Sequence, residues 1–204
     1  MDMKLYFAPG ACSLATHIVL RETGHTFDLE KVNLATKQTE SGEDYTKVNP
    51  KGYVPALRLD NGEVLTEAAV TLQYVADQKP GSGMVPQAGS MERYRLMESL
   101  NFISTEIHKS FGALFNPNIS PAHKEHQLAL IEKRCDVLSQ QLEGKLYLTG
   151  DVFSVADAYL FTVLSWSKVL NVDMTKWPTL TDYIDRVAGR PAVKEAMKAE
   201  GLPG

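Results

Sequence analysis

Residues Lys4 to Ser13 read KLYFAPGACS, an apolar run followed by a Pro-Gly turn and a cysteine. This order predicts a strand, a tight turn and the start of a helix, with Cys12 at the helix N-terminus. The partial positive charge there favours an anion, so the Cys12 thiol is a candidate thiolate or a hydrogen-bond donor to another molecule's thiolate. This stretch alone favours the structural interpretation, in which Cys12 is a small apolar residue packed under the turn.

The segment after the turn completes a β-α-β unit. The pattern predicts a helix with Ser13 as its N-cap and Gly24 at its C-terminal end, then a strand within residues 27–34. A strand that follows a crossover helix is expected to run parallel to the strand before it. Residues 37–44 are polar and predict a solvated loop.

Pro55 stands immediately before a strand-like alternation at residues 56–59. Proline at a strand entry often marks a sheet edge and is sometimes cis, which would expose the backbone of Val54 for a peptide-like ligand. A plain loop-to-strand proline explains the pattern equally well. Residues 60–63, DNGE, predict a hairpin turn, and a further helix is expected to begin at Glu67.

A change in composition divides the chain. The stretch KPGSGMVPQAGS, from Lys79 to Ser90, is rich in glycine, serine and proline, whereas everything after it has helical periodicity. We therefore expect an α/β domain over residues 1–80, a linker over 81–90 and an all-helical domain over 91–204.

The first helix of the second domain carries two stripes. Its apolar stripe is formed by Leu96, Leu100, Ile103, Ile107, Phe111 and Leu114. Beside it lie Asn101, Thr105 and His108 at positions i, i+4 and i+7, which places three hydrogen-bonding side chains along one line. Composition gives no reason for this polar stripe, and a structural histidine is the alternative interpretation of His108.

Two other conspicuous residues have structural explanations. Cys135 falls on the apolar stripe of the next helix and is expected to be an inert packing residue. Ser154 and Asp157 form a capping box ahead of a helix that is apolar on nearly every side, which explains Asp157 better as a cap than as a catalytic acid.

The bulk composition excludes several classes of function. The 204 residues carry a net charge of −4 and no block of Lys or Arg, which argues against nucleic acid or an anionic membrane as partner. There is no secretory signal and no apolar run long enough for a membrane helix, so a cytoplasmic location is expected. The two cysteines lie far apart in unlike contexts, and neither a disulfide framework nor a metal site is predicted.

Four stretches together resemble a known family, and they span essentially the whole chain: KLYFAPGACS at 4–13, NPKGYVPAL at 49–57, LTE at 65–67 and SVAD at 154–157. They are similar to the cytosolic glutathione transferases. The combination of Cys12 with NFIS at 101–104 and His108-Lys109 resembles the bacterial beta class. The resemblance implies a thioredoxin-like α/β domain, an all-α helical-bundle domain and a homodimer that binds glutathione, as co-substrate and without a further cofactor, at the domain boundary.

The resemblance also implies roles for individual residues. Cys12 would lie next to the glutathione sulfur, with which it can form a mixed disulfide, and His108 would act as a donor or base. The implied glutathione-binding residues are Cys12, Lys37, Val54, Pro55, Glu67, Ala68, Asn101, Thr105, Glu106, Ile107 and His108. The family usually has Ser or Gly where this chain has Ala68, so one donor to the γ-glutamyl carboxylate is absent and weaker glutathione binding is expected.

Three functions remain open at this point. The first is conjugation of glutathione to a small hydrophobic electrophile, whose pocket is expected to include Phe111, Phe115 and Trp166. The second is glutathione-dependent reduction of disulfides or peroxides, with Cys12 as nucleophile and glutathione as resolving thiol. The third is a non-catalytic binder of glutathione or of hydrophobic ligands, since fold does not fix function.

Overall fold

The computed structural model describes residues 3–203 and divides into two compact units. We call Met1–Val85 with Gly189–Gly204 the sheet unit, and Pro86–Ala188 the helical unit. The change of unit after Val85 lies within the stretch where the sequence places a linker. The last residues, however, group with the sheet unit and not with the helical domain expected over 91–204.

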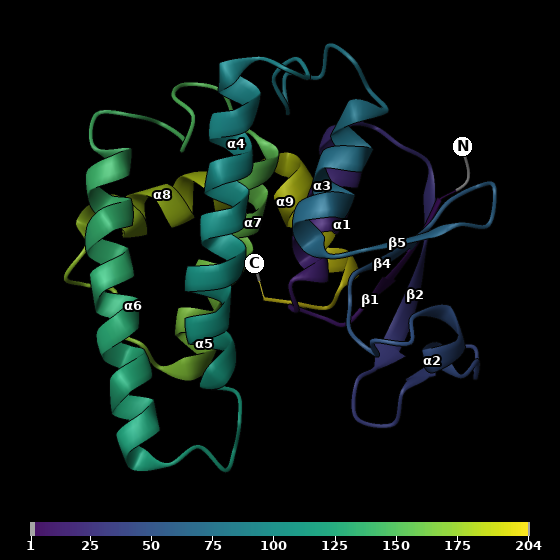
Figure 1. Cartoon of the computed structure of the whole chain (residues 1–204), viewed down its shortest axis with the longest axis horizontal. Coiled ribbons are helices and arrows are strands. Elements are labelled where there is room, and N and C mark those ends of the chain that lie inside the picture. Colours follow the sequence, from purple (N-terminus) through teal and green to yellow (C-terminus); the bar gives the residue numbers. More distant parts are fainter. Residues whose placement is uncertain (1–2, 204) are drawn as a thin grey trace. The chain divides into compact units, whose positions relative to one another are not determined.

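The sheet unit is built on a mixed sheet of five strands in the order β3-β2-β1-β4-β5 (Figure 1). β1 pairs parallel with β2 and antiparallel with β4, and β4 and β5 form an antiparallel hairpin, as the sequence predicts. The prediction of a loop over residues 37–44 is wrong in one detail, because Gln38 and Thr39 pair with the end of β2 as a short strand. The strands are β1 (Met3–Phe7), β2 (Phe27–Asn33), β3 (Gln38–Thr39), β4 (Ala56–Arg58) and β5 (Val64–Thr66).

Four helices complete this unit: α1 (Ser13–Glu22), α2 (Tyr45–Val48), α3 (Ala68–Asp77) and α9 (Pro191–Ala199). The N-cap of α1 is Cys12 and not the expected Ser13. The Ser13 hydroxyl is buried and turns back to the end of β1, where it lies 3.3 Å from the backbone nitrogen of Ala8. The hydroxyl thereby fixes the turn that precedes the cysteine.

The two faces of the sheet bury different parts of the chain. α1 and α3 pack against each other. On another side of the sheet, Tyr6 of β1 packs in one apolar cluster with Tyr45 and Val48 of α2 and with Val54. Because side chains alternate along a strand, β1 supplies both layers. The cluster around Tyr6 packs Val54 against the central strand of the sheet.

Buried polar contacts attach the C-terminal segment to α1. Glu200 accepts a hydrogen bond from His17 Nδ1 at 2.9 Å, and both side chains are fully buried. Arg190 pairs with Glu22 at 2.6 Å. Apolar periodicity does not show such polar pairs, which is why the sequence assigns this segment to the helical domain.

The helical unit consists of α4 (Met91–Phe102), η1 (Ile103–His108), α5 (Lys109–Ala113), α6 (Pro121–Leu142), α7 (Val155–Leu170) and α8 (Pro178–Ala188). The first three follow one another without a break, so the single helix predicted from the apolar stripe exists. Its middle part, η1, is a π-helix, which the sequence does not reveal. Apolar side chains that recur every fourth residue fit the wider π-helical turn as well as the α-helical turn.

α7 is buried on nearly all sides, as predicted, and the capping box anchors its start. Asp157 accepts hydrogen bonds from the backbone N–H groups of Leu148 and Ser154 at 2.8 Å, and from the Tyr183 hydroxyl at 3.0 Å. One carboxylate thus joins the loop before α7, the helix itself and α8. Among residues 3–203, no helix has both the length and the apolar character needed to cross a membrane.

We predict that Asp157→Ala destabilises the protein by about 3 kcal/mol or more, because it leaves several buried donors without an acceptor. Urea unfolding measures this change. Asp185→Ala is the matched control, since Asp185 is exposed on α8 and its loss should change stability by less than about 0.5 kcal/mol. Equal effects of the two substitutions would contradict the structural role of Asp157.

Candidate functional site

Cys12 lies at the start of α1, as the sequence predicts, and is half-buried. Its Sγ donates a hydrogen bond to the backbone oxygen of Val54 at 3.1 Å. The turn before it is fixed from outside, because the Gly10 N–H donates to the Glu200 carboxylate at 2.9 Å. Gly10 has a φ of 70°, which suits glycine, and a Cβ at this position would lie 3.4 Å from the Leu202 side chain. The thiol therefore has a defined position.

Two side chains hold the loop that carries Val54. The Tyr45 hydroxyl and the Asn49 side-chain amide both donate to the carbonyl of Tyr53, each at 2.7 Å. Burial raises the pKa of Tyr45 to about 12, so its hydroxyl stays a donor at physiological pH. The peptide bond between Val54 and Pro55 is cis, and β4 begins only at Ala56. Val54 thus precedes the paired stretch.

Lys37 is attached to the same loop. Its Nζ donates to the backbone oxygen of Gly52 at 2.8 Å and lies 5.7 Å from the centre of the Tyr53 ring. A Cβ at residue 52 would approach the Lys37 side chain to 3.3 Å, so glycine permits this close contact. A positive charge is therefore held two residues from Val54.

Glu67 precedes α3 with a φ of 70°, a left-handed conformation that is uncommon for a residue other than glycine. Its backbone oxygen accepts hydrogen bonds from Val70 and Thr71. Ala68 is the first residue of α3, where backbone N–H groups have no partner within the helix and attract anions. Ala68 itself is buried, and its methyl side chain carries no hydroxyl donor.

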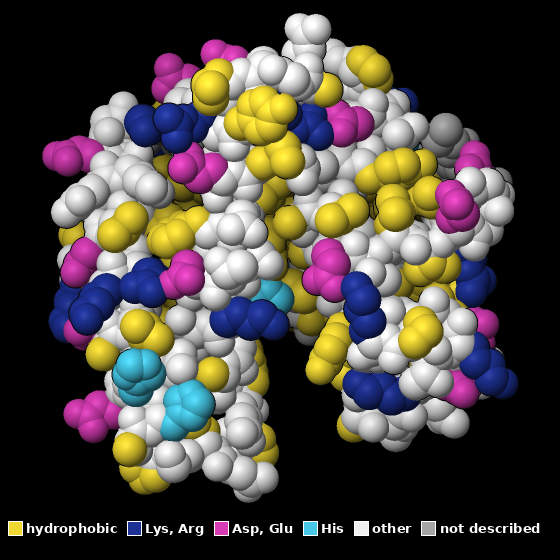
Figure 2. Space-filling view, viewed as in Figure 1, with side chains coloured by type: hydrophobic (Ala, Val, Ile, Leu, Met, Phe, Trp, Pro, Cys, Tyr) yellow, Lys and Arg dark blue, Asp and Glu magenta, His cyan; other side chains and the backbone are white. Residues whose placement is uncertain are grey.

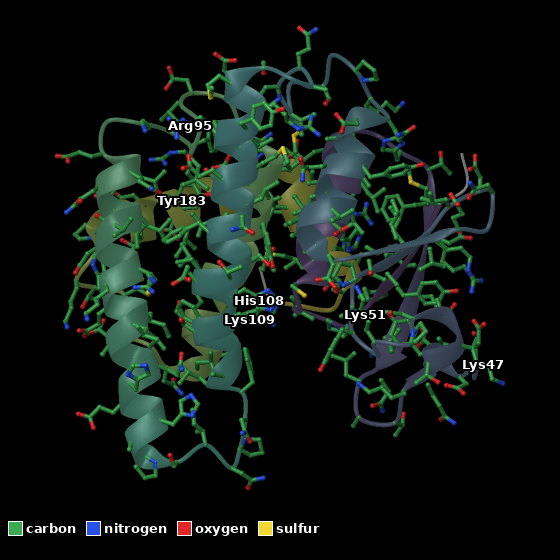
Figure 3. The ribbon with its side chains drawn as sticks, in the orientation of Figure 1. Lys47, Lys51, Arg95, His108, Lys109 and Tyr183 are labelled. Carbon is green, nitrogen blue, oxygen red and sulfur yellow. The ribbon has the colours of Figure 1, made fainter. Side chains whose placement is uncertain are left out.

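Sequence reasoning missed Lys51. Its Nζ donates to the Thr66 hydroxyl at 3.0 Å and pairs with the Glu67 carboxylate at 2.7 Å (Figure 3). The only available signal was its place in the NPKGYVPAL stretch. The loop from Lys51 to Val54 therefore contacts three separate segments: Glu67 through Lys51, Lys37 through Gly52, and Cys12 through Val54. The structure brings together the predicted site residues of the sheet unit.

The predicted residues of the helical unit have unequal surroundings. Asn101 and Thr105 are exposed, and the Thr105 hydroxyl donates to the Asn101 carbonyl at 3.0 Å. Glu106 is paired with Arg134 of α6, whose Nε lies 3.0 Å from its carboxylate. Ile107 is buried, so its side chain belongs to the core of the unit and not to a ligand surface. Helical spacing had already placed Ile107 on the apolar stripe, whereas the resemblance placed it among the binding residues.

His108 is the best-defined of these residues. Its Nδ1 lies 2.7 Å from the hydroxyl of Tyr159, and its ring centre lies 4.9 Å from that of Trp166. Phe115 packs edge-on against Trp166 at 5.5 Å and remains 47% exposed. Phe111, in contrast, is fully buried and cannot line an open pocket as expected. Its place on the apolar stripe already indicated a core role.

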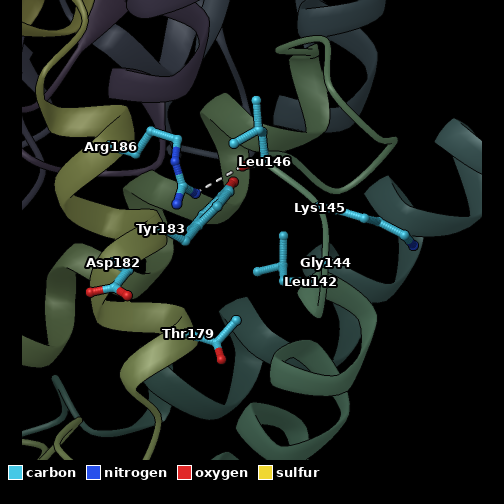
Figure 4. Close-up of a pocket in the computed structure, with 8 residues that line it drawn as sticks. All are labelled: Leu142, Gly144, Lys145, Leu146, Thr179, Asp182, Tyr183 and Arg186. Atoms are coloured by element: carbon cyan, nitrogen blue, oxygen red, sulfur yellow. Dashed lines mark hydrogen bonds between the residues drawn. The ribbon is translucent and has the colours of Figure 1, made fainter.

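A separate cavity of about 240 Å³ lies between α6 and α8 of the helical unit (Figure 4). Lys145, Asp182 and Arg186 line it, and the Arg186 guanidinium donates to the backbone oxygen of Leu146 at 3.0 Å. None of the residues predicted from the sequence as functional contributes to this cavity.

On the face shown in Figure 2, cationic and anionic side chains are interspersed among apolar ones. Within residues 3–203, no group of three or more His, Cys, Asp or Glu side chains has an arrangement that could hold a metal ion.

Each of the two units matches the model of a known protein family. The model of the glutathione S-transferase N-terminal domain matches residues 10–78, and that of the glutathione S-transferase C-terminal domain matches residues 102–191. The chain belongs to the glutathione S-transferase family. This confirms the resemblance seen in the sequence and the thioredoxin-like and helical domains that it implies.

Individual relatives agree with this assignment. The glutathione S-transferase GstA of Escherichia coli O157:H7 is 44% identical over 98% of this chain and 100% of its own length. A sphingomonad glutathione S-transferase complexed with glutathione is 48% identical, with a TM-score of 0.94 over 98% of this chain and all of its own. A bacterial beta class enzyme of Sphingomonas chungbukensis is also 48% identical, with a TM-score of 0.95 over the same shares.

The two cysteines are predicted to differ sharply in reactivity. Burial raises the pKa of the Cys135 thiol to about 12, so it stays protonated and shielded up to pH 9, whereas Cys12 is half-buried at a helix N-terminus. Iodoacetamide should label Cys12 alone in the folded protein and both thiols in denaturant, as peptide mass spectrometry can show. Cys12→Ser is the control and should abolish labelling of the folded protein. Labelling of folded Cys135 would refute the prediction.

Proposed function

We propose that this member of the family conjugates glutathione to small electrophiles by stabilising the glutathione thiolate for attack on carbon. The observation that carries the proposal is the contact between Cys12 and Val54, which puts a thiol at a helix N-terminus beside the backbone of Val54, ahead of β4. In the reaction, a carbon–sulfur bond forms and the leaving group departs with the bonding electrons. The proton of glutathione goes to solvent, so no cofactor is required.

The sheet unit offers a partner for each part of glutathione. The N–H groups at the start of α3, beginning with Ala68, suit the γ-glutamyl carboxylate, and the Glu67 carboxylate suits the α-ammonium group. The backbone of Val54 suits the cysteinyl peptide group. The Lys37 ammonium suits the glycine carboxylate. Since Ala68 supplies no hydroxyl, we expect weaker binding than with serine at this position, by one hydrogen bond.

Cys12 is proposed to act as a donor. Its thiol hydrogen bonds to a carbonyl oxygen, an arrangement that a thiolate could not make, because both atoms would then carry only lone pairs. By a side-chain rotation, the same S–H can donate to the glutathione thiolate instead. A disulfide reductase would need Cys12 itself as the thiolate nucleophile. The observed contact therefore favours conjugation.

The helical unit is proposed to supply further polar groups and the surface for the electrophile. Asn101 and Thr105 are exposed, His108 is half-buried, and Glu106 adds a carboxylate whose position Arg134 restricts. Phe115 gives an exposed apolar surface and packs against the buried Trp166, which lies next to His108. This combination suits a flat, hydrophobic electrophile with a polar leaving group.

The substitution Cys12→Ala separates the two enzymatic hypotheses. We predict that the variant conjugates a halonitroarene with a kcat within about tenfold of wild type, because it loses one donor and no reacting atom. Neither wild type nor variant should reduce a small disulfide with glutathione faster than the uncatalysed reaction. Disulfide reduction that disappears only in the variant would instead make Cys12 a nucleophile. If the conjugation rate of wild type does not saturate with glutathione, only the hypothesis of a non-catalytic binder remains.

A homodimer is proposed on the basis of an exposed apolar strip on α4. Met91, Tyr94 and Met97 follow at intervals of three and are 65%, 57% and 43% exposed. Such side chains at one side of a helix are typical of an interface between copies of a chain. The cytoplasmic location expected from the sequence remains a prediction.

We predict that Tyr94→Glu weakens self-association by about tenfold or more, because a twofold interface would bury the new charge twice. Sedimentation equilibrium measures the dissociation constant. Val152→Glu, at another exposed apolar residue of the helical unit, is the matched control and should leave association unchanged. If Tyr94→Glu behaves like the control, this strip is not the interface.

A further inference from the structure

The imidazole of His108 is held by α7 from two directions. Tyr159 and Trp166 are seven residues apart on α7, so both project from the same side of that helix, two turns apart. The Tyr159 ring is nearly perpendicular to the imidazole, at 89°, and the Trp166 ring meets it at 73°. The ring therefore has little rotational freedom.

The short contact with Tyr159 determines which imidazole nitrogen carries the proton. Tyr159 is only 2% exposed, and its hydroxyl lies 2.7 Å from His108 Nδ1. A phenol is a stronger donor and a weaker acceptor than a neutral imidazole, so the favoured arrangement is O–H from tyrosine to an unprotonated Nδ1. A neutral imidazole with a free lone pair on Nδ1 must carry its proton on Nε2.

We propose that Tyr159 is a positioning residue, which holds His108 as the Nε2–H tautomer and so makes it a hydrogen-bond donor instead of a general base. This inference rests on the proposed function, which it deepens. With Nε2 protonated and Nδ1 engaged, His108 has no lone pair left to accept a proton from a thiol. It can donate from Nε2 to an anionic acceptor, such as a thiolate, a carboxylate or a departing halide.

Nitrogen-15 NMR of the imidazole rings tests the tautomer in the wild-type protein without any turnover. We expect the His108 signals, assigned by their loss in His108→Asn, to show a proton on Nε2 and an Nδ1 shifted as a hydrogen-bonded acceptor. In Tyr159→Phe, the Nδ1 signal should move toward that of an unbonded nitrogen. Tyr183→Phe removes another buried tyrosine hydroxyl from the same unit, bonded to Asp157, and should leave the His108 signals in place.

Steady-state kinetics with a halonitroarene gives the second readout. Loss of one positioning hydrogen bond should lower the kcat of Tyr159→Phe by about fivefold, with the KM for glutathione within about twofold of wild type. Tyr183→Phe should lower the melting temperature but leave kcat unchanged, which separates positioning from mere stability. A wild-type protein without turnover would refute the proposed function, whereas the NMR result would still decide the role of Tyr159.

Two results would overturn the inference. One is a wild-type His108 with its proton on Nδ1, because Tyr159 would then be the acceptor. The other is a folded Tyr159→Phe variant with the nitrogen signals and the kcat of wild type.

Discussion

The hydrogen bond from the Cys12 thiol to the Val54 carbonyl joins the two segments on which the site of the sheet unit depends. Neither segment is regular at this point, since Cys12 sits in a turn and Val54 precedes a strand. Both are made rigid by buried polar contacts: Glu200 holds the turn, and Tyr45 with Asn49 holds the loop. The site is thus positioned by side chains that are not themselves expected to touch a ligand.

The helical unit uses the same principle at His108. α7 is buried almost completely, and the capping box fixes where it begins. Since Tyr159 and Trp166 belong to this buried helix, their contacts with His108 restrict the movement of its imidazole ring. A π-helical turn ends at His108 itself, and such turns are frequent at functional sites.

The sequence predicts a large part of this structure because local patterns determine it. The strand, turn and helix around Cys12, the parallel β2, the hairpin and the core position of Cys135 all follow from periodicity and turn chemistry. The motifs at residues 4–13 and 49–57 were sufficient to identify the family.

What the sequence could not predict depends on contacts between distant residues. The pairing of Lys51 with Glu67, of Glu106 with Arg134 and of His108 with Tyr159 involves polar side chains without periodicity. The cap of α1 was misassigned because two adjacent residues can both serve, and tertiary contacts decide between them. The resemblance placed Ile107 among the binding residues, and the electrophile pocket was expected to include Phe111, although both lie on the apolar stripe and their side chains are buried.

The contact between Gly10 and Glu200 has a consequence for biosynthesis. β1 and the turn are synthesised before the helical unit, but the carboxylate that fixes the turn, and that accepts a hydrogen bond from the buried His17, is synthesised after it. The sheet unit therefore cannot complete its fold until the helical unit has been synthesised, and the side of α1 that α9 covers stays exposed until then. Reliance on chaperones during this interval is the expected result.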